Sequence, residues 1–226
     1  MIDAVIFDCD GVLADSEALS IVGERAALAE LGLDMSAPDY VARYCGMHDR
    51  LFFARLAEDF LAATGAPPPA DFEGRVLAGR RREAHRLRAV AGAQEAMRAA
   101  RAVIGELAVA SSSRAHLLEA KLKRLDLFDL AAPHVYSADL VERGKPAPDV
   151  FLYAADRLGV APGRCLVVED SENGVRAGVA AGMATWGFVG GGHCFDGHGG
   201  RLLAAGAARV VDDHRALAAA FGELVG

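Results

Sequence analysis

The stretch DCDGVLADSE, residues 8–17, places two carboxylates two positions apart directly after the apolar run AVIF. That run is typical of a short buried strand, which we predict over residues 3–8. Asp8 and Asp10 at the end of the strand would repel one another, so we expect a cation beside them or a reaction that uses them. Gly11 follows the pair and allows the chain to turn sharply there.

The composition limits the class of protein. Of the 226 residues, 53% are hydrophobic and 24% are charged, as in ordinary globular proteins. The net charge of −7 disfavours a nucleic-acid partner, which requires a basic face. No apolar run reaches the roughly 18 residues of a membrane span, and the acidic N-terminal region does not resemble a secretory signal. With the scattered cysteines interpreted as reduced thiols, we expect a cytoplasmic protein without a membrane partner, as a monomer or weak homodimer.

Residues 16–88 differ from the rest of the chain because they show helical spacing and no convincing strand. Apolar positions recur every three to four residues up to Gly32, and the signal repeats up to Gly65. The run APPPAD then interrupts the pattern before another helical segment. We predict an all-helical domain over residues 16–88, inserted after the first strand.

From residue 89 onward, strand-like and helical segments alternate. The strand-like segments are ELAVAS, HVYS, RCLVVED, MATWGFV and ARVVDD. This alternation is typical of a parallel sheet covered on both faces. We therefore predict an α/β fold, with a doubly wound, Rossmann-like parallel sheet formed by residues 1–15 and 89–226. In such sheets the ligand binds at the carboxyl ends of the strands.

Polar residues at the ends of these strands, with one lysine that precedes a helix, form a single chemical set. Its members are Asp8, Asp10, Ser111, Lys145, Glu169 and Asp170. Clustered carboxylates disfavour one another's ionisation, and a hard cation removes that cost. Mg²⁺ suits one or two carboxylates together with a phosphate oxygen and waters, so we expect Mg²⁺ as the cofactor. A lysine and a serine beside it can bind the remaining phosphoryl oxygens.

The pair of aspartates also has the chemistry of a phosphoryl-transfer site. An ionised carboxylate is a ready nucleophile near pH 7, because its reference pKa is about 3.9. Asp8 could attack phosphorus and form an aspartyl phosphate that water cleaves. Asp10 could protonate the leaving alcohol and then take a proton from the attacking water.

Four segments carry a resemblance to a known family. DCDGVLADSE, VASSSR, GKPAPDVF and VVEDSENGVRAG are similar, in order and spacing, to the four motifs of the haloacid dehalogenase-like (HAD) phosphohydrolases. The resemblance covers essentially the whole chain. The position of the helical insert resembles the subfamily with a small helical C1 cap, the branch of β-phosphoglucomutases and sugar-phosphate phosphatases. It implies a phosphoric monoester hydrolase with a cap domain over residues 16–88.

The resemblance also implies a role for each core residue. Asp8 is the expected nucleophile, and Asp10 the general acid and base that also offers its backbone carbonyl to Mg²⁺. Ser111 and Lys145 hold the phosphoryl group. Asp170 binds Mg²⁺, and the glutamate before it is either a further ligand or a support for one.

Three other functions are less favoured. The true dehalogenases of the family differ at the second acidic position and need no metal, so Asp10 and the Glu169–Asp170 pair favour phosphate chemistry. β-Phosphoglucomutases carry a histidine five residues after Asp15, where this chain has Ser20, which favours hydrolysis over a phosphosugar mutase. Phospho-accepting signalling domains use a similar acidic pair but lack the helical insert.

Substrate choice is expected to depend on the helical domain. The segment RYCGMHDR, residues 43–50, resembles in position the specificity loop of the subfamily. The predicted substrate-binding residues are Gly46, Met47, His48, Arg50, Ser112 and Arg114. We expect a small phosphorylated substrate, a sugar or a sugar acid. The Gly-rich stretch with His193, Cys194 and His198 matches no familiar zinc spacing and is interpreted as a loop.

Overall fold

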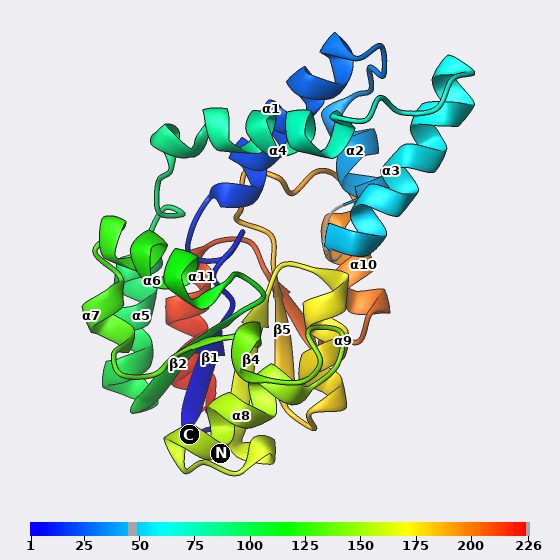
Figure 1. Cartoon of the computed structure of the whole chain (residues 1–226). Helices are drawn as coiled ribbons and strands as arrows, with labels where there is room; N and C mark the ends of the chain where they lie inside the picture. Colours follow the sequence, from blue (N-terminus) through cyan, green and yellow to red (C-terminus); the bar gives the residue numbers. More distant parts are fainter. Residues whose placement is uncertain (45–48, 225–226) are drawn as a thin grey trace. The chain divides into compact units, whose positions relative to one another are not determined.

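The computed structural model describes residues 1–44 and 49–224, and the chain forms two compact units. One unit consists of residues 1–15 and 88–226 and contains a sheet, whereas the other consists of residues 16–87 and is helical. Figure 1 shows the path of the chain through both. Within the described ranges, no helix is both long enough and apolar enough to cross a membrane.

A parallel sheet of six strands forms the centre of the first unit, in the order β3-β2-β1-β4-β5-β6 (Figure 1). The strands are β1 (Ala4–Phe7), β2 (Glu106–Ser111), β3 (Val135–Ser137), β4 (Cys165–Glu169), β5 (Ala184–Phe188) and β6 (Arg209–Val211). The chain builds outward from β1 to β3 and then returns to β4, so the strand order reverses between β1 and β4. The predicted doubly wound α/β fold is confirmed. In such a sheet the ligand crevice lies at the point of reversal.

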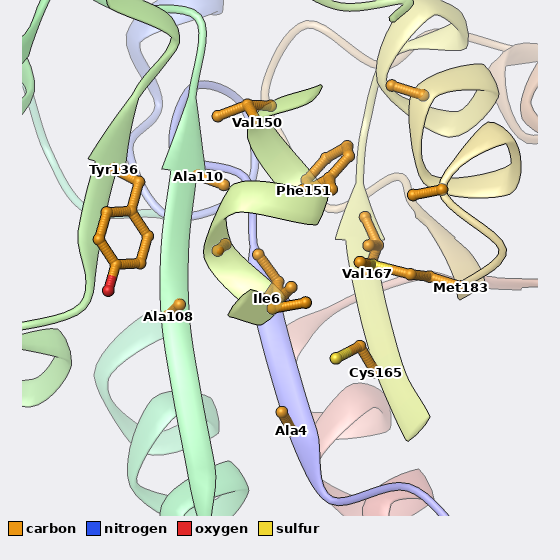
Figure 2. Close-up of a cluster of buried hydrophobic side chains, with 14 residues drawn as sticks. Ala4, Ile6, Ala108, Ala110, Tyr136, Val150, Phe151, Cys165, Val167 and Met183 are labelled. Atoms are coloured by element: carbon orange, nitrogen blue, oxygen red, sulfur yellow. The ribbon is translucent and has the colours of Figure 1, made fainter. Parts of the chain in front are cut away.

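Helices cover both faces of the sheet (Figure 1). They are α5 (Ala93–Val103), α6 (Ala115–Arg124), α7 (Phe128–Ala131), α8 (Asp149–Leu158), α9 (Glu172–Ala180), α10 (His198–Ala204) and α11 (His214–Ala220), with 3₁₀ turns at Ala138–Leu140, Pro162–Arg164 and Phe221–Leu224. In Figure 2, Val150 and Phe151 of α8 pack over Ile6 of β1 and Val167 of β4. All four residues of β1 are fully buried, which is why its sequence is a continuous apolar run.

The second unit is a helical bundle with its own core. It contains α1 (Ser16–Glu30), α2 (Ala37–Tyr44), α3 (Asp49–Thr64), α4 (Phe72–Arg82) and a 3₁₀ turn at Ala84–Arg86. Its buried aromatic and aliphatic residues include Leu28, Tyr40, Phe52, Leu56 and Val76. Helices α1 and α4 approach closely at Gly23 and Gly79. A Cβ atom added at Gly23 would lie only 2.0 Å from the carbonyl oxygen of Gly79, so there is room only for glycine.

The basic run Arg80–Arg82 forms the last turn of α4, where it could contact a substrate or face solvent. In the structure two of its members are engaged within the bundle. Arg80 forms an ion pair with Glu24, a buried carboxylate that also accepts a hydrogen bond of 2.6 Å from the Tyr40 hydroxyl. Arg82 forms an exposed pair of 3.1 Å with Glu30. These contacts join α1 to α2 and α4.

Candidate active site

The fold brings three carboxylates together where the strand order reverses. Asp8 directly follows β1, Glu169 is the last residue of β4, and Asp170 follows it. All three are buried, and one carboxylate oxygen from each lies within 4.8 Å of those of the other two. Buried carboxylates at such distances need positive charge beside them. The donor set is composed of hard oxygen ligands, which fits Mg²⁺.

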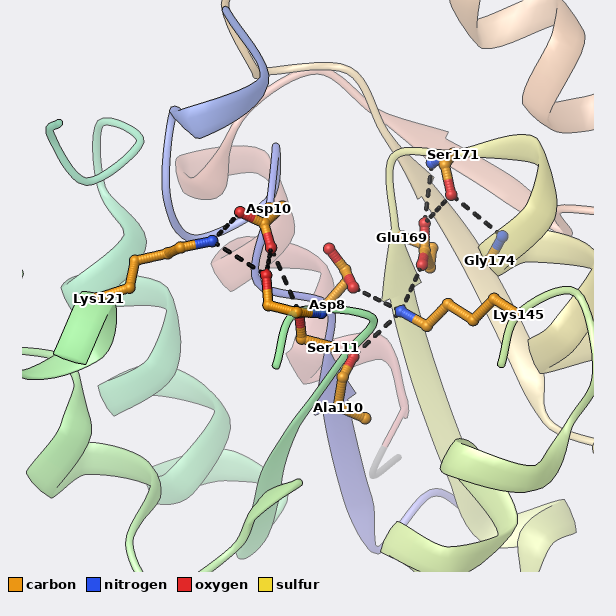
Figure 3. A network of polar contacts seen from close by, with 10 residues as sticks. Asp8, Asp10, Ala110, Ser111, Lys121, Lys145, Glu169, Ser171 and Gly174 are labelled. Carbon is orange, nitrogen blue, oxygen red and sulfur yellow. Dashed lines mark hydrogen bonds and ion pairs between the residues drawn. The ribbon is translucent and has the colours of Figure 1, made fainter. Parts of the chain in front are cut away.

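Lys145 provides one positive charge from the loop before α8 (Figure 3). Its Nζ donates to Asp8 Oδ1 at 2.5 Å, to Glu169 Oε1 at 2.8 Å and to the carbonyl oxygen of Ala110 at 3.1 Å. Its side chain is almost fully buried. The lysine therefore holds carboxylates from two strands in one place, as expected from their positions at the strand ends.

The pKa values of this cluster follow from burial and charge. Burial raises the pKa of Asp8 well above its ordinary value, and the carboxylates of Glu169, Asp170 and Asp10 add to the effect, while the Lys145 ammonium opposes it. Burial lowers the pKa of Lys145, but Asp8 and Glu169 outweigh burial and raise it above its ordinary value. Lys145 is thus charged, and additional positive charge beside Asp8 would favour its ionised form.

Glu169 is held on its other oxygen by the start of α9. Its Oε2 accepts from the backbone N–H of Ser171 at 2.8 Å and from the Ser171 hydroxyl at 2.9 Å (Figure 3). The same hydroxyl caps the helix by accepting from the Gly174 N–H at 3.1 Å. A Cβ atom at Gly174 would lie 1.7 Å from Glu169 Oε1, so only glycine leaves room for this carboxylate.

Asp10 lies in a separate polar cluster beside the first. Its Oδ1 forms an ion pair with Lys121 of α6, and its Oδ2 accepts from the hydroxyls of Ser113 at 2.7 Å and Ser111 at 3.3 Å. Figure 3 shows Lys121 directed toward Asp10. Sequence reasoning predicted Asp10 and Ser111 but missed Lys121 and Ser113. Lys121 lies 111 residues from Asp10 along the chain and carries no motif signal, whereas the run SSSR could have pointed to Ser113.

Asp170 is held by two histidines of the Gly-rich loop. Its Oδ2 contacts His193 Nε2 at 2.9 Å, and its carbonyl oxygen accepts from His198 Nε2 at 2.6 Å. Burial alone would lower the pKa of His193, but the hydrogen bond to Asp170 and the neighbouring Cys194 outweigh it and raise the pKa to about 11. The interpretation of this stretch as a simple loop was therefore incomplete, because its histidines reach the carboxylate cluster.

The same loop gathers three potential metal donors of another kind. One ligand atom each of His193, Cys194 and His198 lies within 4.8 Å of the others. The histidine nitrogens already have partners, however: His193 Nε2 contacts Asp170, and His198 contacts Asp170 through Nε2 and Arg201 through Nδ1 at 2.9 Å. The loop thus serves the carboxylate cluster through these contacts.

The structure describes only some of the predicted substrate-binding residues. Gly46, Met47 and His48 lie outside the described residues, and for Arg50 only the backbone, in α3, is described. Ser112 and Arg114 are exposed in the turn between β2 and α6, directly after the buried Ser111. Their proposed contact with a substrate stays a prediction.

Comparison with known proteins decides the family. The chain matches the haloacid dehalogenase-like hydrolase family over residues 2–182. It belongs to this family. The phosphorylated carbohydrates phosphatase of Thermotoga maritima is 33% identical over 211 residues, which cover 92% of this chain and 94% of that protein. Hexitol phosphatase B of Escherichia coli K12 is 34% identical over 185 residues, 80% of each chain. The predicted membership, and with it the class of HAD-like phosphoric monoester hydrolase, is confirmed.

Two further matches complete the comparison. Protein SUPPRESSOR OF QUENCHING 1 of Arabidopsis thaliana, a chloroplastic protein, is 33% identical over 184 residues, but the match spans only 17% of that longer protein. Among solved structures, a conserved haloacid dehalogenase-like protein of unknown function from Agrobacterium tumefaciens C58 is 32% identical with a TM-score of 0.88, and the match covers 100% of both chains. Both units of this HAD protein thus have a counterpart in a solved relative.

Proposed function

We propose that this HAD protein is a Mg²⁺-dependent phosphatase that hydrolyses a small phosphorylated sugar or sugar acid through an aspartyl phosphate on Asp8. The observation that carries the proposal is the buried trio of Asp8, Glu169 and Asp170 with Lys145 bridging two of its members. A relative that matches almost the whole chain is named a phosphorylated carbohydrates phosphatase.

The metal would be held by Asp8, Glu169 and Asp170, together with the backbone carbonyl of Asp10 that the family resemblance implies. The fit rests on three buried carboxylates that offer hard oxygen ligands, and the pKa of Asp8, which burial and the neighbouring carboxylates raise, agrees with it. When bound, Mg²⁺ supplies charge that keeps Asp8 ionised and neutralises the phosphoryl oxygens.

In the first step, a carboxylate oxygen of Asp8 attacks the phosphorus atom and forms a new P–O bond. The bond between phosphorus and the sugar oxygen breaks, and its electron pair stays on that oxygen. Asp10, two residues away, donates a proton to the leaving oxygen so that an alcohol departs. Lys145 and Ser111 stabilise the charge that spreads over the phosphoryl oxygens in the transition state.

In the second step, a water molecule attacks the phosphorus of the aspartyl phosphate. The bond between phosphorus and the Asp8 oxygen breaks, which restores the carboxylate and releases inorganic phosphate. Asp10 accepts the proton that the water loses, and is then ready to act as an acid again. The contacts of Asp10 with Lys121, Ser111 and Ser113 support this role, because they hold its carboxylate in one place.

We further propose that the helical unit, residues 16–87, acts as a cap that selects the leaving group, with its segment 43–50 as the specificity loop. All the residues of the proposed chemistry belong to the other unit. The cap would exclude water while the phosphoryl group is transferred.

The test is phosphate release from a panel of phosphorylated sugars, sugar acids and nucleotides, with Mg²⁺ and with excess chelator. We expect metal-dependent release concentrated on sugar phosphates, and loss of release in Asp8→Asn. Isomerised product without free phosphate would instead support a phosphosugar mutase, and no reaction with any member would contradict the proposal.

A further inference from the structure

The loop between β5 and α10 has no role in the chemistry described so far, although it contacts the metal-binding cluster. It contains GGGHCFDG, residues 190–197, and ends at His198, the first residue of α10. Its histidines are distant in sequence from every core motif residue, yet His193 and His198 are both buried beside Asp170. In metal sites, hydrogen-bond partners of a coordinating side chain fix its orientation. A buried histidine in contact with Asp170 can act in this way.

The side chain of Asp170 is fixed by His193. The contact of 2.9 Å joins Nε2 to Oδ2, and the side chains are only 3% and 4% exposed, so water does not compete for it. A carboxylate held on one oxygen by a rigid ring cannot rotate about its Cβ–Cγ bond without breaking that contact. His193 therefore sets the plane in which Asp170 presents its oxygens.

The main chain of Asp170 is fixed by His198. The guanidinium of Arg201 donates to His198 Nδ1 at 2.9 Å, so the ring proton lies on Nε2 and is donated to the Asp170 carbonyl at 2.6 Å. The rings of the two histidines meet edge to face, with their centroids 5.4 Å apart. Each histidine thus supports the other as well as Asp170.

Glycines allow the loop to come this close. A Cβ atom at Gly191 would lie 2.6 Å from the carbonyl oxygen of Gly11, and a Cβ atom at Gly11 would lie 1.8 Å from Asp170 Oδ2 and 2.7 Å from His193 Cε1. The loop is also anchored by the Gly192 N–H, which donates to Asp15 Oδ1 at 3.0 Å. The loop is thus packed directly against the turn that follows the proposed nucleophile.

We propose that His193, supported by His198, is a positioning residue that orients Asp170 as a cation ligand. The inference rests on the proposed function, since it assigns a purpose to Asp170 within that metal site. It predicts that the loss of His193 weakens cation binding while the proposed nucleophile, acid and phosphate-binding lysine remain in place.

The test compares three substitutions of His193. Glutamine can place its amide nitrogen where Nε2 lies, asparagine is one carbon shorter and falls short of Asp170, and leucine removes the polar group. We expect Mn²⁺ binding, measured by electron paramagnetic resonance on the metal-free protein, to be about 10- to 100-fold weaker in His193→Asn and His193→Leu. His193→Gln should retain most of the affinity.

Activity provides a second readout that separates positioning from general damage. The Mg²⁺ concentration for half-maximal activity should rise in His193→Asn, whereas the rate at saturating Mg²⁺ should recover toward that of the parent protein. A merely structural defect would lower the rate at every Mg²⁺ concentration. His134→Leu is the matched control, because this half-buried histidine bonds the Tyr136 hydroxyl at 2.8 Å and precedes β3, at the opposite edge of the sheet.

Two results would overturn the inference: unchanged Mn²⁺ affinity in folded His193→Asn, or equal losses in His193→Asn and His193→Gln. If His193→Leu does not fold, the asparagine and glutamine pair still decides the question. Failure of the proposed function has a different signature, because the parent protein would then neither bind Mn²⁺ at this site nor release phosphate.

Discussion

Each carboxylate of the site is paired with a cation or with hydrogen-bond donors from a different part of the chain. Lys145 serves Asp8 and Glu169, and Lys121 serves Asp10. These contacts matter because an unpaired buried carboxylate is costly and tends to become neutral. The proposed chemistry needs Asp8 as an anion and Asp10 in a fixed place. The partners of the carboxylates therefore contribute to the proposed chemistry by keeping these groups charged and in position.

Lys121→Met should lower kcat/KM by about 10²-fold, since a proton-transfer group that loses its position by about 1 Å can cost that much. The side chain of methionine keeps the bulk of the lysine stem but cannot hold Asp10 or contact Ser113. Lys123→Met on the same helix is the control, because Lys123 is exposed and contacts Glu119 at 2.6 Å and the Phe128 ring rather than Asp10. Steady-state kinetics with the preferred substrate measures both. An equal decrease of kcat/KM in the two variants would show that Lys121 does not position Asp10.

Acid should destabilise the fold through His214. Burial lowers the pKa of this histidine, against the opposing effects of the Val12 carbonyl, Asp213 and Glu95. The structure shows the cause. Nε2 donates to the Val12 carbonyl at 2.8 Å. The buried Nδ1 has no hydrogen-bond partner among the described residues, so a proton added there would find no acceptor. The unfolded chain, with a reference pKa of about 6.5, takes up that proton more readily, so stability is lost as pH falls through that value.

This pH effect can be measured by urea unfolding at pH 7.5 and pH 5. His214→Gln keeps a donor for the Val12 carbonyl but cannot titrate, so its unfolding free energy should fall less between these pH values than that of the parent protein. An identical fall in both proteins would show that His214 does not contribute.

The core residues of the site could be predicted because they sit at strand ends. Asp8 and Asp170 follow apolar runs that only a buried parallel strand explains, and parallel strands bring their carboxyl ends to one edge. Lys121, His193 and His198 could not be predicted in the same way. Their contacts depend on how a helix and a loop pack in three dimensions, and neither spacing nor periodicity encodes that packing.

At the scale of elements, the packing of α1 on α4 depends on two glycines. The backbones approach so closely at Gly23 and Gly79 that a Cβ atom on either would overlap the carbonyl oxygen of the other, at 2.0 and 2.3 Å. Helices of this kind need small residues at the crossing, and helical periodicity alone does not reveal which glycines serve this purpose. The sequence predicted the helices of this unit, but not the pairing of α1 with α4.

Gly23→Ala should destabilise the helical unit by about 1–3 kcal/mol, the usual cost of overpacking. Gly74→Ala in α4 is the matched control, because nothing lies within 4 Å of its Cβ position and alanine favours helix by about 1 kcal/mol. Urea unfolding of both variants gives the comparison. Destabilisation by Gly74→Ala with no effect of Gly23→Ala would contradict the observed helix crossing.

At the scale of the whole molecule, the proposed chemistry and the proposed substrate selection belong to different units. Residues 1–15 and 88–226 contain every side chain of the carboxylate clusters, and residues 16–87 contain the segment that resembles a specificity loop. The sequence predicted this organisation from a change of period, from strand alternation to helical spacing. It could not predict the substrate, because leaving groups are recognised by a few side chains with no motif of their own.

His48→Ala and Arg50→Ala should therefore lower kcat/KM unequally for different substrates. The least affected substrate should react at nearly the rate of the parent protein. The expected result is a shift of kcat/KM ratios across a panel of sugar phosphates, in the order of 10-fold for a lost polar contact of about 1.4 kcal/mol. Arg75→Ala, in α4 of the same unit, is the control, because Arg75 pairs with Glu30 of α1 at 3.8 Å. A uniform decrease for every substrate would argue that the segment supports the chemistry instead.

The central claim, a phosphoryl group carried by Asp8, can be tested by acid quench during turnover followed by mass spectrometry of the digested protein. We expect a phosphoryl group on the peptide that contains residues 8–17, lost on mild alkaline treatment as an acyl phosphate should be, and missing from Asp8→Asn. Active turnover with no modified peptide, or with the modification at another residue, would contradict it.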